Sequence, residues 1–294
     1  MRADLHVHTN ASDGRLDPQE VVRLAVEIGL NAIAITDHDT VGGIAAALET
    51  ARAFASFIVI PGVEINTDVP DGEVHILGYF LDYTDERLES TLQKLRNARW
   101  VRAQEMVTKL SKLGMNIEWS RVEELARGKA ICRPHIAQAL LEKGYISCEK
   151  EAFDKYIGHG GPAYVERYKL SPVEAVKLII MARGLPVLAH PADINELDHL
   201  IRELKEAGLV GIEVYYRDYD SATINRLLDI ANRYSLIATG GTDYHGFNDG
   251  IEVMMGTTVT PPQSLNQLFA LADPQILGLL PAANYVLKSL LTKD

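Results

Sequence analysis

Short apolar runs alternate with stretches of helical spacing along most of the chain. Seven runs have the length and composition of buried strands, and they cover residues 3–8, 31–36, 57–65, 73–80, 186–190, 210–215 and 236–240. Helical spacing begins near Asp17 and recurs near residues 43–55, 172–183, 196–207 and 221–234. This alternation is typical of an α/β protein with a parallel sheet, and 294 residues suit one large barrel.

Two of the expected helices carry the same start signal. A capping residue is followed by proline and, two residues after the proline, by glutamate, as in Asp17-Pro18-Gln19-Glu20 and Ser171-Pro172-Val173-Glu174. Proline suits the first helical position, and the glutamate completes a capping box with the first residue. These signals predict helices that begin at Pro18 and Pro172.

The alternation breaks between about Asp82 and Glu166. Helical spacing dominates there, in stretches near 84–113, 121–127 and 134–143, and strand-like sequence returns only at 162–165. We interpret residues 82–166 as an inserted helical cap subdomain over the mouth of a barrel formed by residues 1–81 and 167–294. The last dozen or so residues are expected to form a surface tail or a terminal helix.

Histidines and carboxylates gather where the expected strands end. Six short motifs carry them: Asp4-Leu5-His6-Val7-His8, Thr36-Asp37-His38-Asp39, Gly62-Val63-Glu64, Glu73-Val74-His75, Ala189-His190-Pro191 and Gly241-Thr242-Asp243-Tyr244-His245. His6 and His8 alternate along a strand, so their side chains point to the same face. Active sites of parallel barrels lie at the carboxyl ends of the strands. Imidazoles and carboxylates in that position predict a hydrolytic site with several metal ions.

Composition and charge narrow the classes of function. The net charge of −11 argues against an extended nucleic-acid-binding surface. No stretch approaches the ~20 apolar residues of a membrane helix, and the N-terminus has no signal-peptide pattern. The two cysteines, Cys132 and Cys148, have no framework spacing and are expected to be reduced thiols. These features predict a cytoplasmic protein without a membrane partner, and they leave the oligomeric state open.

Together the six motifs resemble those of the PHP (polymerase and histidinol phosphatase) phosphoesterase family. They occur in the family's order between residues 4 and 246, so the resemblance covers most of the chain. The segment Arg133-Pro134-His135-Ile136-Ala137 is similar to the TrpH-like branch, which includes nucleoside 3′,5′-bisphosphate phosphatases and a bacterial 5′–3′ exoribonuclease. The resemblance implies a distorted (β/α)7 TIM-like barrel that holds two or three divalent ions.

The resemblance also implies nine metal ligands. The first metal would be bound by His6, His8 and Asp243, the second by His75 and His190 with Glu64 bridging the two, and the third by Asp13, His38 and His245. Several PHP proteins have histidine where this chain has Asp13, and the harder oxygen donor favours Mn²⁺ or Fe²⁺ over Zn²⁺. We expect Mn²⁺, with Fe²⁺, Zn²⁺ or Mg²⁺ as alternatives. Asp37 is expected to orient a ligating imidazole from behind.

The expected reaction is hydrolysis of a phosphate ester by hydroxide generated at the metals. No serine or cysteine with a convincing base partner offers a covalent route, and Glu64, Asp243 and His190 are the expected catalytic residues. Arg99 and Arg102 lie three apart on one expected helix, and Arg133 begins another. Guanidinium groups bind phosphate bidentately, so these arginines and His135 are candidate substrate-binding residues. The alternative for Arg99 and Arg102 is a solvated basic face.

The expected substrate is a small phosphorylated molecule, either a nucleoside 3′,5′-bisphosphate or a short 5′-phosphorylated RNA. Three alternatives remain open at this stage. The substrate could be another metabolite such as histidinol phosphate, the chain could be a non-catalytic regulatory module, or a similar barrel could hydrolyse a C–N bond. The complete set of expected ligands argues against the regulatory module.

Overall fold

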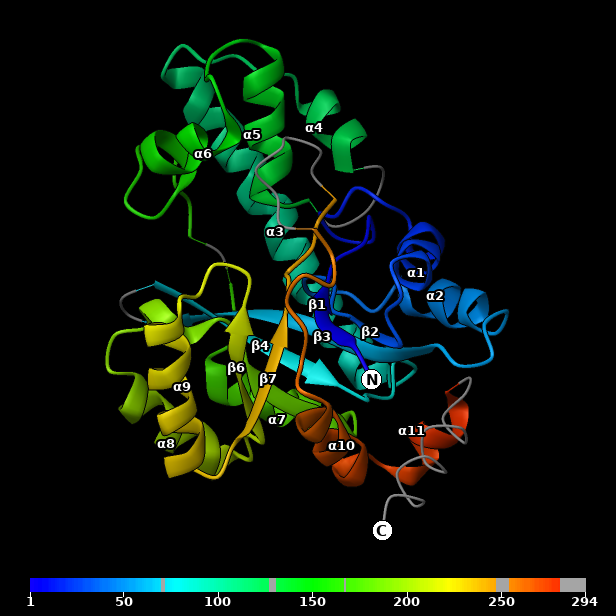
Figure 1. Cartoon of the computed structure of the whole chain (residues 1–294). Coiled ribbons are helices and arrows are strands. Elements are labelled where there is room, and N and C mark those ends of the chain that lie inside the picture. Colours follow the sequence, from blue (N-terminus) through cyan, green and yellow to red (C-terminus); the bar gives the residue numbers. More distant parts are fainter. Residues whose placement is uncertain (70–71, 127–130, 167, 247–253, 281–294) are drawn as a thin grey trace.

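The computed structural model describes residues 1–69, 72–126, 131–166, 168–246 and 254–280. One seven-stranded sheet follows the order of the chain (Figure 1), with strands β1 (Ala3–Val7), β2 (Ala32–Ile35), β3 (Ile58–Val69), β4 (Gly72–Tyr79), β5 (Leu185–Leu188), β6 (Gly211–Tyr216) and β7 (Ile237–Gly241). A parallel bridge between Val7 and Tyr244 brings the first and last strands together. The sheet is therefore a nearly closed barrel, and the predicted α/β barrel fold is confirmed.

One strand runs against the predicted direction. β4 is antiparallel to both β3 and β5, whereas every other neighbouring pair is parallel. The prediction of an all-parallel sheet is therefore wrong at β4. Parallel neighbours need a crossover of about a dozen residues or more, but only residues 70 and 71 separate β3 from β4 in sequence. A return in the opposite direction is the connection that this length allows.

Helices cover the outside of the barrel (Figure 1), namely α1 (Pro18–Glu27), α2 (Ile44–Ala51), α7 (Pro172–Met181), α8 (Leu197–Ala207), α9 (Ser221–Arg233), α10 (Pro262–Leu271) and α11 (Pro274–Leu279). Both predicted capping boxes are present, at the starts of α1 and α7. The sequence analysis did not predict α10 and α11. The expected C-terminal tail lies outside the described residues. No helix in the described ranges is both long and apolar enough to cross a membrane.

The predicted insertion is helical and has a hydrophobic cluster of its own. It contains α3 (Glu86–Lys112), α4 (Trp119–Ala126), α5 (Arg133–Glu142), α6 (Glu149–Ala152) and a π-helical turn at Phe153–Ile157. Apolar side chains between Ala103 and Val165 form this second cluster. The strand-like residues 162–165 form no strand. Figure 1 shows α4, α5 and α6 gathered on one side of the barrel, beyond the far end of α3.

Helix α3 joins the two clusters. Leu88, Leu92 and Leu95 pack into the barrel core, whereas Met106 and Leu110 belong to the second cluster. The helix begins with Asp85 as its N-cap, whose carboxylate accepts the backbone N–H groups of Arg87 and Leu88. The first half of α3 therefore packs on the barrel and the second half on the second cluster. The subdomain boundaries at residues 82 and 166 stay a prediction.

Candidate metal centre

Glu64 in β3 and the other eight predicted ligands lie in one centre. The others come from the end of β1 and its following loop (His6, His8, Asp13), from beyond β2 (His38), from β4 (His75), from beyond β5 (His190) and from beyond β7 (Asp243, His245). Local sequence positions each side chain on its own strand, and closure of the barrel makes them converge.

The first group of facing atoms is buried at the centre. His8 Nε2 lies 3.0 Å from Asp243 Oδ1 and 3.3 Å from Glu64 Oε2. His6 Nε2 lies 3.3 Å from the same Asp243 oxygen and 3.4 Å from the same Glu64 oxygen. Ligand atoms bound at about 2.1 Å to one ion are separated by about 3.0–3.4 Å in octahedral or tetrahedral geometry. The four atoms are therefore spaced as ligands of a single ion.

Several atoms of this group have no hydrogen-bond partner. His6 Nε2, His8 Nε2 and Glu64 Oε2 are buried and have no hydrogen bond among the described residues. Buried polar atoms are almost always hydrogen-bonded, because leaving them unsatisfied costs about 1–3 kcal/mol each. Convergence of unsatisfied nitrogen and oxygen atoms on one point is the arrangement that a divalent cation would satisfy. The residues present therefore fit a bound metal.

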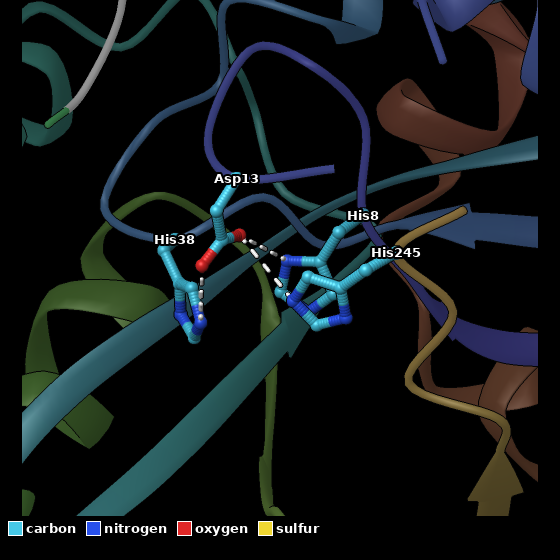
Figure 2. Close-up of side chains that lie close together, drawn as sticks. All are labelled: His8, Asp13, His38 and His245. Atoms are coloured by element: carbon cyan, nitrogen blue, oxygen red, sulfur yellow. Dashed lines mark ion pairs between the residues drawn. The ribbon is translucent and has the colours of Figure 1, made fainter. Parts of the chain in front are cut away.

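A second group surrounds the carboxylate of Asp13 (Figure 2). His245 Nε2 lies 3.3 Å from Asp13 Oδ1, and His38 Nε2 lies 3.7 Å from Asp13 Oδ2. His8 Nδ1 also faces Asp13, at 3.7 Å, and its ring stacks on that of His245. His8 therefore turns one nitrogen toward each group, a sharing that the sequence had not indicated.

The third group lies on the other oxygen of Glu64. His75 Nδ1 is 2.8 Å and His190 Nε2 is 3.2 Å from Glu64 Oε1. His38 Nδ1 is 2.9 Å from Glu64 Oε2, the oxygen that also faces His6 and His8. The two oxygens of Glu64 thus face different sets of imidazoles, as a carboxylate between two ions must.

The charges of the centre are strongly coupled. Burial opposes protonation of His8 and His75, yet the neighbouring carboxylates raise the pKa of His8 to about 10 and that of His75 to about 9. Burial alone would raise the pKa of Glu64, but the surrounding imidazoles hold it well below its usual range. The carboxylates thus create a strong demand for positive charge, which divalent ions can meet in place of protons.

Glu213 in β6 orients the centre from behind, and the sequence analysis missed it. Its carboxylate oxygens lie 3.2 and 3.3 Å from His6 Nδ1, and Oε2 accepts the backbone N–H of His190 at 2.9 Å. The side chain is fully buried. A glutamate inside the apolar run Gly211-Ile212-Glu213-Val214 was the available signal, because a buried charge needs a partner. Tyr216 similarly donates to Asp243 Oδ2 at 2.8 Å.

Asp37 has a different role from the predicted one. Its carboxylate accepts the Thr9 backbone N–H at 2.8 Å and the hydroxyl groups of Thr9 and Ser12, each at 2.7 Å. No described contact joins Asp37 to an imidazole by hydrogen bond. Asp37 accepts hydrogen bonds from the loop after β1, so this carboxylate fixes the segment leading to Asp13 instead.

The predicted substrate arginines are not solvated. Arg99 and Arg102 are each 4% exposed, so the alternative of a solvated basic face is wrong. Arg99 donates to Asp39 Oδ2 at 2.6 Å and to the side-chain oxygen of Asn66. Asn66 in turn lies 2.6 Å from His75 Nε2. Arg99 therefore supports the centre through Asn66, and direct phosphate binding by Arg99 and Arg102 stays a prediction.

Arg133 and His135, both in the first turn of α5, have different partners. Arg133 donates to Glu73 Oε2 at 2.7 Å, and Lys169 donates to Glu73 Oε1 at 2.8 Å. His135 accepts the backbone N–H of Cys132 through Nδ1 at 3.0 Å, at the start of α5. His190, not His135, is the histidine that contacts Glu64.

Two cavities reach the centre. The larger, about 530 Å³, is lined by Glu73, His75 and His190 together with the start of α8. The smaller, about 190 Å³, is lined by Asp13 and by Arg15, His135 and Gln138. A substrate phosphate can therefore approach the proposed metal ligands from either cavity.

Known proteins are similar to this chain in sequence and in fold. The PHP domain model matches residues 4–165. The chain is 34% identical to the 5′-3′ exoribonuclease Rnm of Escherichia coli over 82% of this chain and 84% of that protein. It is 32% identical to a 3′,5′-nucleoside bisphosphate phosphatase of Chromobacterium violaceum, over 88% and 92% of the two chains. The crystal structure of a protein from Bifidobacterium adolescentis, described as a putative metal-dependent phosphoesterase, superposes with a TM-score of 0.85 at 30% identity, over 93% and 97%.

These relationships agree with the geometry of the centre. The imidazoles and carboxylates that could bind metal ions cluster at one end of the barrel, where enzymes with barrel folds have their active sites. The chain belongs to the PHP domain family and is a metal-dependent phosphoesterase.

Proposed function

We propose that this phosphoesterase hydrolyses phosphate esters of small nucleotides, either nucleoside 3′,5′-bisphosphates or short 5′-phosphorylated RNA. The observation that carries the proposal is one buried histidine–carboxylate centre open to two cavities of about 530 and 190 Å³. Two cavities allow a phosphate to sit at the centre while the rest of a nucleotide extends away from it. The names of the two curated relatives support the same substrate class.

In this proposal the nine ligands hold two or three divalent ions. His6, His8 and Asp243 would hold the first, Glu64 would bridge it to a second ion at His75 and His190, and Asp13, His38 and His245 would hold the third. The carboxylate oxygen of Asp13 beside the imidazoles favours Mn²⁺, with Fe²⁺, Zn²⁺ or Mg²⁺ as alternatives. When bound, such ions lower the pKa of water toward roughly 7 and neutralise the charge of the reacting phosphate.

The chain's own groups would then position the reaction. Glu213 and Tyr216 fix His6 and Asp243 through the contacts described above. His190 lines the larger cavity and contacts Glu64, so it lies where the reacting phosphate would pass. Arg133, beside His75 through Glu73, is the residue we assign to a second phosphate. His135 would contact substrate in the smaller cavity.

A substrate panel tests the proposed function. The protein is reconstituted with Mn²⁺ and assayed for hydrolysis of a nucleoside 3′,5′-bisphosphate, a 5′-phosphorylated trinucleotide, histidinol phosphate and an aryl phosphate. We expect kcat/KM to be highest for the nucleotides and activity to disappear on chelation. Preference for histidinol phosphate, or activity that persists after verified metal removal, would contradict the proposal.

A further inference from the structure

A third cavity lies beside the loops that carry two of the proposed ligands. It has a volume of about 580 Å³, and Ala11 and Thr40 line it on the barrel side. Ala11 is two residues from Asp13, and Thr40 is two residues from His38. The opposite wall is formed by Gln93, Arg96, Asn97 and Trp100 of α3. None of the nine proposed ligands lines this cavity, and the proposed function does not use it.

Trp100 offers this cavity an aromatic surface. Its side chain is 43% exposed, and its ring meets that of Trp119 edge to face, with 5.6 Å between the centroids. Trp119 therefore supports the indole from the second cluster while leaving much of its surface open. Exposed aromatic rings beside a catalytic site are the platforms on which single-stranded nucleic acids stack their bases.

The polar groups around Trp100 favour an uncharged ligand. The guanidinium of Arg96 donates to Glu89 at 2.5 Å, to Gln93 at 2.7 Å and to the backbone oxygen of Asp39 at 3.0 Å. Its charge is already matched by Glu89, so the cavity has little attraction for a phosphate. Gln93 donates to Asn97 Oδ1 at 2.9 Å, and the second N–H of each amide can donate to the edge of a base.

The cavity is close enough to serve a substrate bound at the centre. Two residues of extended chain span about 7 Å at most, so Ala11 and Thr40 cannot be farther than that, backbone to backbone, from Asp13 and His38. A nucleotide chain with one phosphate at the centre could therefore place a neighbouring base beyond these loops. The net charge of −11 disfavours contact with many phosphates, so stacking of bases is the expected way to hold such a chain.

We propose that this cavity binds a nucleobase of an oligoribonucleotide by stacking on Trp100, while another part of the same substrate occupies the metal centre. The inference rests on the proposed function for its substrate class and extends it by assigning a second binding site. In this proposal a mononucleotide occupies the centre alone, whereas an oligonucleotide occupies both places. The cavity would therefore distinguish oligonucleotides from nucleoside bisphosphates.

The test compares substrates of different length in matched variants. In W100A, the ratio of KM for a 5′-phosphorylated tri-adenylate to KM for adenosine 3′,5′-bisphosphate should rise about tenfold, within the range of lost base stacking. W100F should recover most of the loss because it keeps an aromatic face. V101A is the control, since Val101 is 50% exposed on the same helix but does not line the cavity. An unchanged ratio in W100A would overturn the proposal.

A binding measurement separates this inference from the proposed function. The chain has two tryptophans, so W119F leaves Trp100 as the only indole reporter. Tri-adenylate should quench the fluorescence of this metal-loaded variant, and adenosine bisphosphate should quench it far less. Quenching without hydrolysis of any nucleotide would support the cavity while refuting the proposed function. Hydrolysis of tri-adenylate without quenching would refute the cavity alone.

Discussion

At the scale of single residues, Glu213 sets the orientation of the His6 ring. Its carboxylate fixes one ring nitrogen of His6, so the other points at Glu64 and Asp243. We expect E213Q to lower metal affinity about 10–100-fold, the usual cost of losing a partner behind a ligand. Metal titration by calorimetry measures the effect. E203Q is the control, because Glu203 is 54% exposed. Equal affinities in the two variants would exclude the orienting role.

Arg133 provides the residue-scale test of substrate recognition. R133A should raise KM for a nucleoside 3′,5′-bisphosphate by a factor of about ten to one hundred, since a charge-assisted contact contributes roughly 1.5–3 kcal/mol. A minimal aryl phosphate should be affected little, because it lacks the second phosphate. R52A serves as the control, since Arg52 is 67% exposed and pairs with Glu49 on the surface. Equal losses on both substrates would instead place Arg133 at the reacting phosphate or in the fold.

At the scale of elements, the start of α3 affects both hydrophobic clusters. D85A should destabilise the protein by about 1 kcal/mol, because it removes the acceptor of the Arg87 and Leu88 N–H groups. Urea unfolding measures the loss, and D85N should retain most of the stability because asparagine is also a good N-cap. Similar stability of D85A and the wild type at neutral pH would show that the cap contributes little.

The same cap gives a pH dependence. Hydrogen bonds from the Arg87 side chain and from the Leu88 backbone lower the pKa of Asp85 to about 2, below the ordinary value near 3.9. A depressed pKa in the folded state means that the stabilisation is complete above the unfolded pKa and is lost as pH falls through the folded one. The difference in unfolding free energy between wild type and D85A should therefore be constant above about pH 5 and shrink below pH 4. A difference that grows on acidification would contradict this assignment.

At the scale of the whole molecule, metal binding would join strand ends that are distant in sequence. The proposed ligands come from six of the seven strands or the loops after them, so unfolding would disperse the site. An ion at 100 times its Kd adds about 2.7 kcal/mol to the unfolding free energy. The melting temperature should then rise by roughly 4 °C for each such ion between chelated and Mn²⁺-loaded protein. Scanning calorimetry measures this shift, and no shift at saturating metal would rule out a site of the proposed kind.

The sequence by itself determined the features that depend on neighbours along the chain. The capping boxes at Asp17 and Ser171 predicted where α1 and α7 begin, and the alternation of apolar runs predicted the barrel. The ligand types were visible because most of them lie in short motifs beside apolar runs, although Glu64 and His75 lie inside β3 and β4 and not at the strand ends. Residues 82–166 were recognisably helical because their spacing changes from that of strands to that of helices.

Tertiary structure decided everything that depends on groups far apart in sequence. The antiparallel direction of β4 follows from its short connection and from pairing with β5, over 100 residues later. Glu213 acquires its role only because β6 lies behind His6, and Arg99 faces Asp39 and Asn66 only because α3 packs over the barrel. His8 faces two groups because the loop after β1 turns Asp13 back toward one of its nitrogens, while barrel closure brings Asp243 to the other. Periodicity along one strand determines which face a side chain takes, but not which partner meets it there.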